Sequence, residues 1–183
     1  MKKTIIMSSV LLCHLLPLQV HADELSNAPP LATYAGLESL YNRISDHSHE
    51  YNPLSAKLRA GIFLQTNIAL ELQLGGNIHS DKMDNSREIS LTDQTGLFLR
   101  FQSPIEQGVR VYLYGGYNEL TLTQTAGNGF MKRDSRLESS AWGMGFEEQM
   151  SQLKNVIFYL DYSRPYDDEI RISQYSLGAR YQF

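Results

Sequence analysis

Residues 68–74 read Ile68-Ala69-Leu70-Glu71-Leu72-Gln73-Leu74, and this short stretch decides the fold class. Isoleucine or leucine occupies every second position, and alanine, glutamate and glutamine occupy the positions between them. Successive side chains of a β-strand point to opposite faces, so the pattern predicts a strand with one apolar face and one polar face. We find no helix-length window with a 3.6-residue apolar repeat, which favours an all-β fold.

The same alternation recurs along most of the chain. In the last segment, aromatic and aliphatic residues alternate with Ser176, Gly178, Arg180 and Gln182. The first segment alternates less regularly, so it predicts a strand without fixing which of its side chains share a face. Eight strands are predicted, at residues 33–44, 57–64, 68–74, 96–102, 109–116, 141–147, 156–163 and 175–183.

The connections between these segments alternate in length. Residues 65–67, 103–108 and 151–155 form short links, and residues 45–53, 78–90, 121–137 and 164–170 form longer, polar links. In an up-and-down arrangement, all short links lie at one end and all long links at the other. Transmembrane barrels have this asymmetry. The sequence therefore predicts an all-β fold, an eight-stranded antiparallel up-and-down transmembrane β-barrel.

The first residues are expected to be removed from the mature protein. Lys2 and Lys3 precede an apolar run that ends at Leu18, and small residues at Val20 and Ala22 form a cleavage motif. The run is too short for a transmembrane helix, which needs about 20 apolar residues. We expect a signal peptide at residues 1–22, a flexible periplasmic leader at 23–31 and the barrel at 32–183.

Composition excludes several other classes of protein. The only cysteine, Cys13, lies in the expected signal peptide, so no disulfide or thiol chemistry is expected. A net charge of −4 offers no basic face, and we expect no nucleic-acid partner. No second long apolar run exists, which excludes a helical membrane protein. Strands that are apolar at alternate positions remain compatible with a mean hydropathy of −0.31.

Charge placement bears on whether the barrel is soluble or embedded in a membrane. A soluble barrel also alternates, but it turns its apolar face inward. In a membrane barrel the charged face must point inward, because a charge that faces lipid costs about 2–4 kcal/mol near the midplane. We expect a lumenal charge network that consists of Lys57, Arg59, Glu71, Arg100, Arg110, Glu147, Asp161 and Arg180.

Glycines and aromatic residues give two weaker indications. Glycine on the polar face makes room for long lumenal side chains, or it marks bulges and bends. Aromatic rings near segment ends suit a membrane interface, although strand propensity favours the same residues. The glycines are Gly61, Gly96, Gly116, Gly143, Gly145 and Gly178, and the aromatic residues are Tyr117, Trp142, Tyr162, Tyr166 and Tyr175.

The closing strands resemble a known family. Residues 141–147, 158–163 and 176–183 are similar to the last strands of the small outer-membrane β-barrels, namely the OmpA transmembrane domain, OmpX and the opacity proteins. Residues 58–61 and 65–71 resemble their second and third strands. The resemblance implies a location in the outer membrane, among its lipids and lipopolysaccharide. It also implies that Phe183 and Tyr181 belong to the C-terminal signal that the barrel-assembly machinery reads.

The resemblance also implies a class of function. We expect a non-enzymatic protein without a cofactor, whose lumen is closed by charged side chains. A structural, adhesion or recognition role would lie in four extracellular loops that meet a host or phage surface ligand. A lipid A-modifying enzyme is one alternative, but its Ser/His/acid chemistry needs a serine beside a histidine, and His47, His49 and His79 all fall in expected loops. A narrow gated channel is the other alternative.

Two loop motifs could form binding sites. His47-Ser48-His49-Glu50 could chelate a metal, but no second cluster completes a site, so a solvated loop is expected there. Tyr166-Asp167-Asp168-Glu169 could bind a cation that bridges lipopolysaccharide phosphates or could contact a partner, and a solvated loop is again the commoner case. No metal site is expected.

Overall fold

The computed structural model describes residues 32–45, 50–82, 88–125, 132–150, 152–153, 155–167 and 170–183. The expected signal peptide and leader lie outside these residues. The described residues form ten strands, and the eight long ones correspond to the eight that the sequence predicts. The strands are β1 (Thr33–Ser45), β2 (Glu50–Tyr51), β3 (Leu54–Gln65), β4 (Ile68–His79), β5 (Asp81–Lys82), β6 (Glu88–Gln102), β7 (Val109–Thr125), β8 (Lys132–Gln149), β9 (Val156–Asp167) and β10 (Arg171–Gln182).

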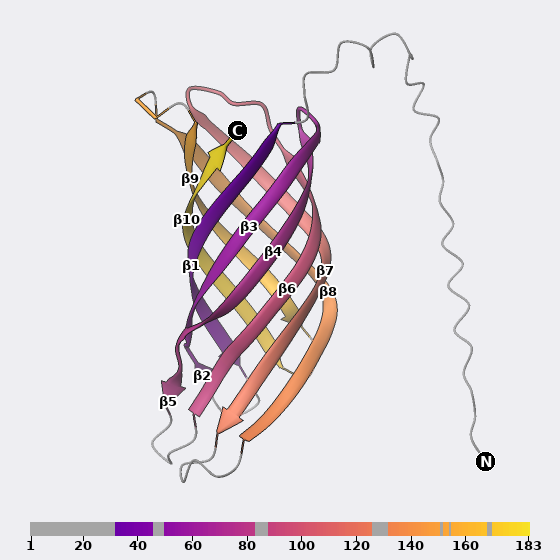
Figure 1. The fold of residues 1–183 in the computed structure, drawn as a ribbon, viewed down its shortest axis with the longest axis vertical. Coiled ribbons are helices and arrows are strands. Elements are labelled where there is room, and N and C mark those ends of the chain that lie inside the picture. Colours follow the sequence, from indigo (N-terminus) through magenta and orange to yellow (C-terminus); the bar gives the residue numbers. More distant parts are fainter. Residues whose placement is uncertain are drawn as a thin grey trace, which may run out of the picture. The chain divides into compact units, whose positions relative to one another are not determined.

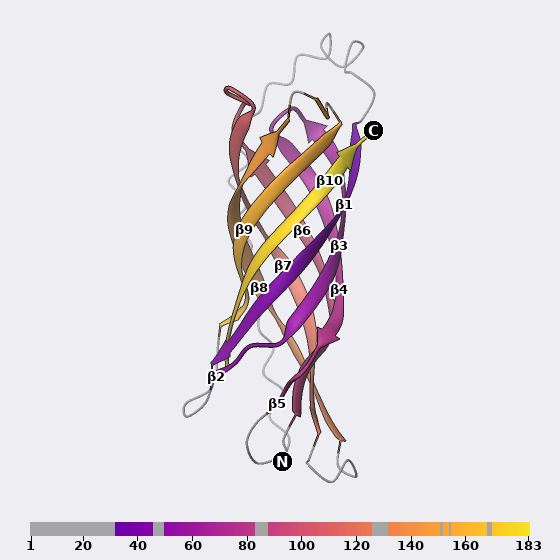
Figure 2. The ribbon, with the colours of Figure 1, turned by 90° about the vertical axis from the view of Figure 1, so that its left-hand side faces the viewer.

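The long strands form one closed antiparallel sheet. Their order is β10-β9-β8-β7-β6-β4-β3-β1, and β1 pairs back onto β10 from Tyr34↔Gln182 to Ser45↔Arg171. Figures 1 and 2 show the strands tilted around a common axis. Each long strand therefore pairs with the next one along the chain, and the last pairs with the first. The predicted eight-stranded up-and-down barrel is confirmed.

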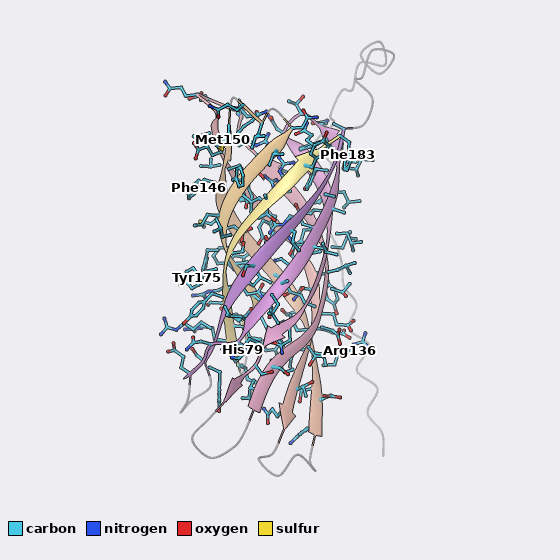
Figure 3. The ribbon with its side chains drawn as sticks, turned by 60° about the vertical axis from the view of Figure 1, so that its left-hand side comes forward. His79, Arg136, Phe146, Met150, Tyr175 and Phe183 are labelled. Carbon is cyan, nitrogen blue, oxygen red and sulfur yellow. The ribbon has the colours of Figure 1, made fainter. Side chains whose placement is uncertain are left out.

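The two ends of the barrel differ. The C-terminus and the connections β3–β4, β6–β7 and β8–β9 lie at one end, which we call the turn end (Figure 1). Strands β2 and β5, the end of β7 and the start of β8 lie at the opposite end, the loop end. In Figure 3, Phe183 and Met150 mark the turn end, while His79 and Arg136 lie towards the loop end.

Several strands run farther towards the loop end than the sequence indicated. Residues 121–137 were expected to form a loop, but β7 continues to Thr125 and β8 begins at Lys132, with Leu122 paired to Ser135. The other long connections are shortened in the same way, and His79 is the last residue of β4 rather than a loop residue. These segments lack apolar alternation because they have no lipid to face, yet their backbones still pair.

In its central part the barrel is apolar outside and polar inside. Leu70, Leu99 and Phe158 are 36%, 44% and 41% exposed, whereas Glu71 and Arg100 are fully buried. A soluble barrel would show the reverse. This arrangement exposes a continuous aliphatic surface that belongs in contact with acyl chains, as in transmembrane barrels. The described residues contain no helix that is long and apolar enough to span a membrane.

Candidate functional site

Arg59 is the centre of a buried ionic cluster in the middle of the barrel. Its Nη2 lies 2.8 Å from Glu38 Oε2 and 2.7 Å from Asp161 Oδ2, and its Nη1 lies 3.4 Å from Glu71 Oε1. Lys57 Nζ reaches Glu38 Oε1 at 2.7 Å. All five side chains are at most 2% exposed, so these charges are shielded from water and depend on one another.

Glu147 forms a second centre, nearer the turn end. Its carboxylate oxygens lie 2.5 Å from Arg100 Nη2, 2.6 Å from Arg110 Nε and 2.8 Å from Arg180 Nε. Arg100 Nη1 also lies 3.7 Å from Glu71, which joins the two centres. The structure thus brings all eight charged residues expected from the sequence into one connected ionic cluster.

Two further members of this cluster were missed by the sequence analysis. Glu38, on β1, adds a fourth carboxylate to the five basic groups, and Tyr34 donates its hydroxyl to Glu71 Oε2 at 2.5 Å. The first segment carries polar and apolar residues on both faces, so alternation could not fix its phase. Pairing with β3, which sets Glu38 opposite Lys57, is what places both side chains inside.

The guanidinium groups of two arginines stack on tyrosine rings. The guanidinium carbon of Arg100 lies 3.8 Å from the ring centre of Tyr112, and that of Arg180 lies 4.4 Å from the ring centre of Tyr34. Each of these arginines therefore stacks on a ring and pairs with an acid, which leaves its guanidinium little rotational freedom. The arrangement is that of a rigid ionic core.

Two of the inward glycines, Gly61 and Gly143, make room for rings rather than for arginine or glutamate side chains. A Cβ added at Gly61 would collide with the ring of Tyr34, and one at Gly143 would collide with the ring of Tyr114. The expectation that these glycines accommodate long charged side chains is therefore wrong at both positions. The glycine and the ring fit together as one packing unit.

A layer of uncharged amides lies on the loop side of the ionic cluster. Gln174 Nε2 donates to Asn42 Oδ1 at 2.8 Å and to Gln94 Oε1 at 2.9 Å. Gln94 Nε2 in turn donates to Asn118 Oδ1 at 3.4 Å. All four amides are at most 3% exposed. They form a neutral polar boundary above the charges.

Above the amides, at the loop end, the interior is apolar. Six inward aliphatic side chains are at most 8% exposed and pack together, and we call this set the apolar plug. Tyr166, which the sequence placed at the membrane interface, packs against the plug instead. The plug consists of Ile44, Ile89, Leu91, Leu120, Leu122 and Ile172.

A β-bulge on β6 helps to explain why the sequence did not reveal the plug. The pairing of β6 with β7 shifts between Leu91 and Asp93, where β6 has one residue more than β7. An extra residue reverses the alternation beyond it. As a result, odd-numbered Leu91 and even-numbered Gln94 both point inward, and a strict period of two assigns one of them wrongly.

The outer surface ends in a row of aromatic rings on the loop side. Trp142 and Tyr162 have ring centres 5.9 Å apart, and Tyr162 and Tyr175 have ring centres 5.2 Å apart. Tyr41 lies opposite Tyr175 on the neighbouring strand. We call these four residues the aromatic row. Amphipathic rings at one height mark the boundary between acyl chains and head groups.

Comparison with known proteins agrees with this architecture. The attachment invasion locus protein Ail of Yersinia pestis is 13% identical, with a TM-score of 0.63 over 85% of this chain and 100% of that one. Neisserial surface protein A is 16% identical, with a TM-score of 0.64 over 83% and 99%. The N-terminal β-barrel domain of Pseudomonas aeruginosa OprF is 16% identical, with a TM-score of 0.58 over 82% and 97%. No protein-family model and no curated protein matches the sequence.

This chain folds as a small outer-membrane β-barrel. The exposed aliphatic surface, the aromatic row and the closed eight-stranded sheet all place it in the outer membrane. Barrels of this type have short periplasmic turns and longer outer loops.

The two loop motifs can now be located on this outer-membrane barrel. Residues 47–49 lie outside the described part of the chain, and Glu50 pairs with Arg43 at 2.7 Å. Within the described ranges, no group of three His, Cys, Asp or Glu side chains could hold a metal ion. Asp167 lies 3.0 Å from both Arg164 Nη1 and Arg171 Nε. Residues 168 and 169 are also outside the described part.

The C-terminal residues of the barrel lie on its outer face at the turn end. Phe183 is 72% exposed and Tyr181 is 45% exposed, with ring centres 5.1 Å apart. Phe183 N donates to Thr33 O at 2.9 Å, which ties the last residue to the first strand. Both rings are accessible to an assembly factor that would approach through the membrane, and their role as an assembly signal stays a prediction.

Proposed function

We propose that this outer-membrane barrel is a non-enzymatic surface protein, with the barrel as a closed anchor and recognition at its loop end. The filled interior is the observation that carries the proposal. Ionic, amide and apolar layers follow one another from the turn end to the loop end. An interior packed in this way resembles the core of a soluble protein. Water-filled pores are typical of larger barrels.

The loop end supplies the surface for recognition. Strands β7 and β8 have 17 and 18 residues, whereas β3, β4, β9 and β10 have 12 each. A tilted strand needs about 9–11 residues to cross a bilayer. The β7–β8 hairpin therefore projects well beyond the aromatic row. Its outward side chains include Glu119, Arg136 and Glu138, which suits contact with a polar ligand.

A structural neighbour suggests the first ligand to test. Ail was solved in complex with sucrose octasulfate, a heparin analogue. The similarity to this chain shows a common fold, and the binding of a sulfated glycan is our proposal for the present protein. Exposed Arg133 on β8 supplies positive charge to such a ligand, whereas Arg136 is paired with Glu119 and Glu138.

The test shortens the β7–β8 hairpin and leaves the plug in place. Leu122 and Ser135 are paired, so residues 123–134 can be replaced by Asn-Gly, which forms a tight hairpin turn. We expect cells that display the shortened protein to lose binding to a heparin surface, while the protein keeps its heat-modifiable gel migration. Leu113→Ala, on the lipid-facing side, is the control for unchanged binding. Full binding by the shortened protein would refute recognition by this hairpin.

A mass spectrum of lipid A tests the proposal that the protein has no enzymatic activity. Deletion of the protein should leave the mass spectrum of lipid A unchanged. A modified lipid A species that disappears in the deletion strain, and returns with the intact chain, would favour the lipid-modifying alternative.

A further inference from the structure

The buried charges of the barrel interior do not cancel. Five basic and four acidic side chains are buried there, so the described residues leave one positive charge in excess. The described strand ends that lead to residues 46–49, 83–87, 126–131 and 168–169 lie at the loop end, beyond the layer of amides and the apolar plug. The bases are Lys57, Arg59, Arg100, Arg110 and Arg180, and the acids are Glu38, Glu71, Glu147 and Asp161.

The centre around Arg59 is neutral. There Lys57 and Arg59 both contact Glu38, and Arg59 also contacts Asp161. Two bases therefore meet two acids, even when the shared Glu71 is assigned to the other centre. The excess charge does not belong to this part of the ionic cluster.

The excess belongs to the centre around Glu147, which we call the Glu147 centre. With Glu71 assigned to it as well, three bases meet two acids there among the described residues. An uncompensated charge in a buried interior costs several kcal/mol, so a further negative charge would stabilise this centre. Its bases are Arg100, Arg110 and Arg180.

The same three arginines retain unpartnered N–H groups. Among the described residues, no hydrogen-bond partner exists for the buried atoms Arg100 Nε, Arg110 Nη2 and Arg180 Nη1. Rings of Tyr112 and Tyr34 lie against two of the guanidinium planes, so the N–H groups project from their edges. All three guanidinium groups contact one carboxylate and therefore lie close together. The centre thus offers free donors from β6, β7 and β10 within one small region.

The Glu147 centre is accessible from the turn end. Arg110 is 8% exposed, whereas Arg100 and Arg180 are at most 1% exposed. Two acids lie near Arg110 at this end, but Glu106 and Glu148 are both exposed, and Glu148 stands on the outer face opposite Val109. The ion pair of Arg110 is with Glu147. A small solute can therefore approach the centre past Arg110, while the plug closes the loop end.

We propose that the Glu147 centre binds a halide ion, chloride in a saline medium, against the unpartnered N–H groups of Arg100, Arg110 and Arg180. A halide supplies the missing negative charge, whereas a water molecule supplies none. Hydrogen bonds from a guanidinium to an anion are stronger than those to a neutral acceptor. A spherical ion also accepts donors from several directions, as three strands require. The site goes beyond the proposed function and is independent of recognition by the β7–β8 hairpin.

The line width of the chloride NMR signal tests the site, because an ion that exchanges with a protein site gives a broader line than a free ion. The purified protein, with residues 23–31 retained, is placed in zwitterionic micelles in gluconate buffer and titrated with sodium chloride. We expect saturable broadening that sodium bromide reverses. Arg110→Gln should weaken chloride binding about tenfold or more, since it removes a charged donor and the excess charge.

Lys57→Gln is the matched control, because it removes one buried charge from the neutral centre. We expect K57Q to keep most of the chloride binding, and equal losses in K57Q and R110Q would overturn the location. An unaltered protein that does not broaden the signal would overturn the site. That result would follow if Lys57 gave up its proton, or if a carboxylate of Asp23 or Glu24 took the place of the ion. Displacement by sulfate as effective as that by bromide would overturn the assignment to a halide.

Crystals of the unaltered protein grown in sodium bromide give a second measurement that needs no variant. We expect an anomalous bromide peak beside Arg100, Arg110 and Arg180, and a map without a peak there would overturn the site. Heat-modifiable migration shows whether each variant is folded, and the bromide map decides if R110Q does not fold. Loss of chloride binding with intact heparin binding would leave the proposed function unaffected.

Discussion

Arg59 Nη2 and Asp161 Oδ2 lie 2.7 Å apart inside the barrel, although the two residues are 102 positions apart in the sequence. They connect β3 to β9, which are not neighbours in the sheet. Asp161 also accepts hydrogen bonds from Tyr112 at 3.0 Å and from Ser176 at 2.5 Å. The pair therefore links opposite parts of the barrel wall across the interior. We expect it to contribute to stability rather than to transport.

Asp161→Asn tests this interpretation. The amide keeps the size of the side chain but leaves the buried Arg59 with less compensating charge, and breaking a buried pair in this way costs about 3 kcal/mol. Urea unfolding in lipid vesicles should show this loss. Asp167→Asn, which removes an exposed carboxylate from a pair of similar geometry, should leave the unfolding midpoint unchanged. Equal midpoints for D161N and the unaltered protein would contradict the bracing role.

The central and turn-end parts of the barrel could be predicted from sequence because their strands alternate strictly. Leu70, Leu99 and Phe158 face lipid while Glu71 and Arg100 face inward, as the period of two requires. The inward direction of the charges follows from physics alone, since lipid excludes them. Here sequence and membrane impose the same constraint.

The loop end could not be predicted because its strands do not alternate strictly and their outer faces do not all contact lipid. A bulge beside Leu91 reverses the alternation on β6, and the projecting parts of β7 and β8 face water on their outer side. Inward Leu122 then lies in the segment 121–137, which the sequence predicts to be a polar loop. Glu38 was missed for a related reason, since β1 mixes residue types on both faces. Bulge positions depend on pairing between strands and leave no local signal.

Gly61→Ala tests the packing of glycine against tyrosine. The added methyl would collide with the ring of Tyr34, and overpacking of this kind costs about 1–3 kcal/mol. Gly115→Ala is the matched control, because the nearest atom to its new Cβ is the Ala141 carbonyl oxygen at 3.9 Å. We expect a lower unfolding midpoint for G61A only. Equal effects of the two substitutions would show that lost backbone freedom, and not the ring, decides the outcome.

Glu71→Gln tests whether the ionic cluster controls an ion path. Glu71 contacts Arg59, Arg100 and Tyr34, so its loss rearranges the centre of the cluster. The apolar plug still fills the loop end, and a dry apolar segment resists the entry of ions. We expect near-zero conductance in planar bilayers for both the unaltered protein and E71Q. Discrete conductance steps that E71Q changes would support the gated-channel alternative.

Leu120→Asn tests the plug itself. Leu120 is fully buried among the aliphatic side chains of the plug, so the substitution removes apolar contact and buries an amide, opposite Gln94 of β6, at this position. The two effects together should lower the free energy of unfolding by about 3 kcal/mol. Thr121→Asn, at the next position and on the outer face, should change it by less than about 0.5 kcal/mol. Unfolding in urea, followed by Trp142 fluorescence, measures both variants. A stable L120N barrel would mean that the plug accommodates a polar side chain, and the apolar closure on which the proposed function depends would then be wrong.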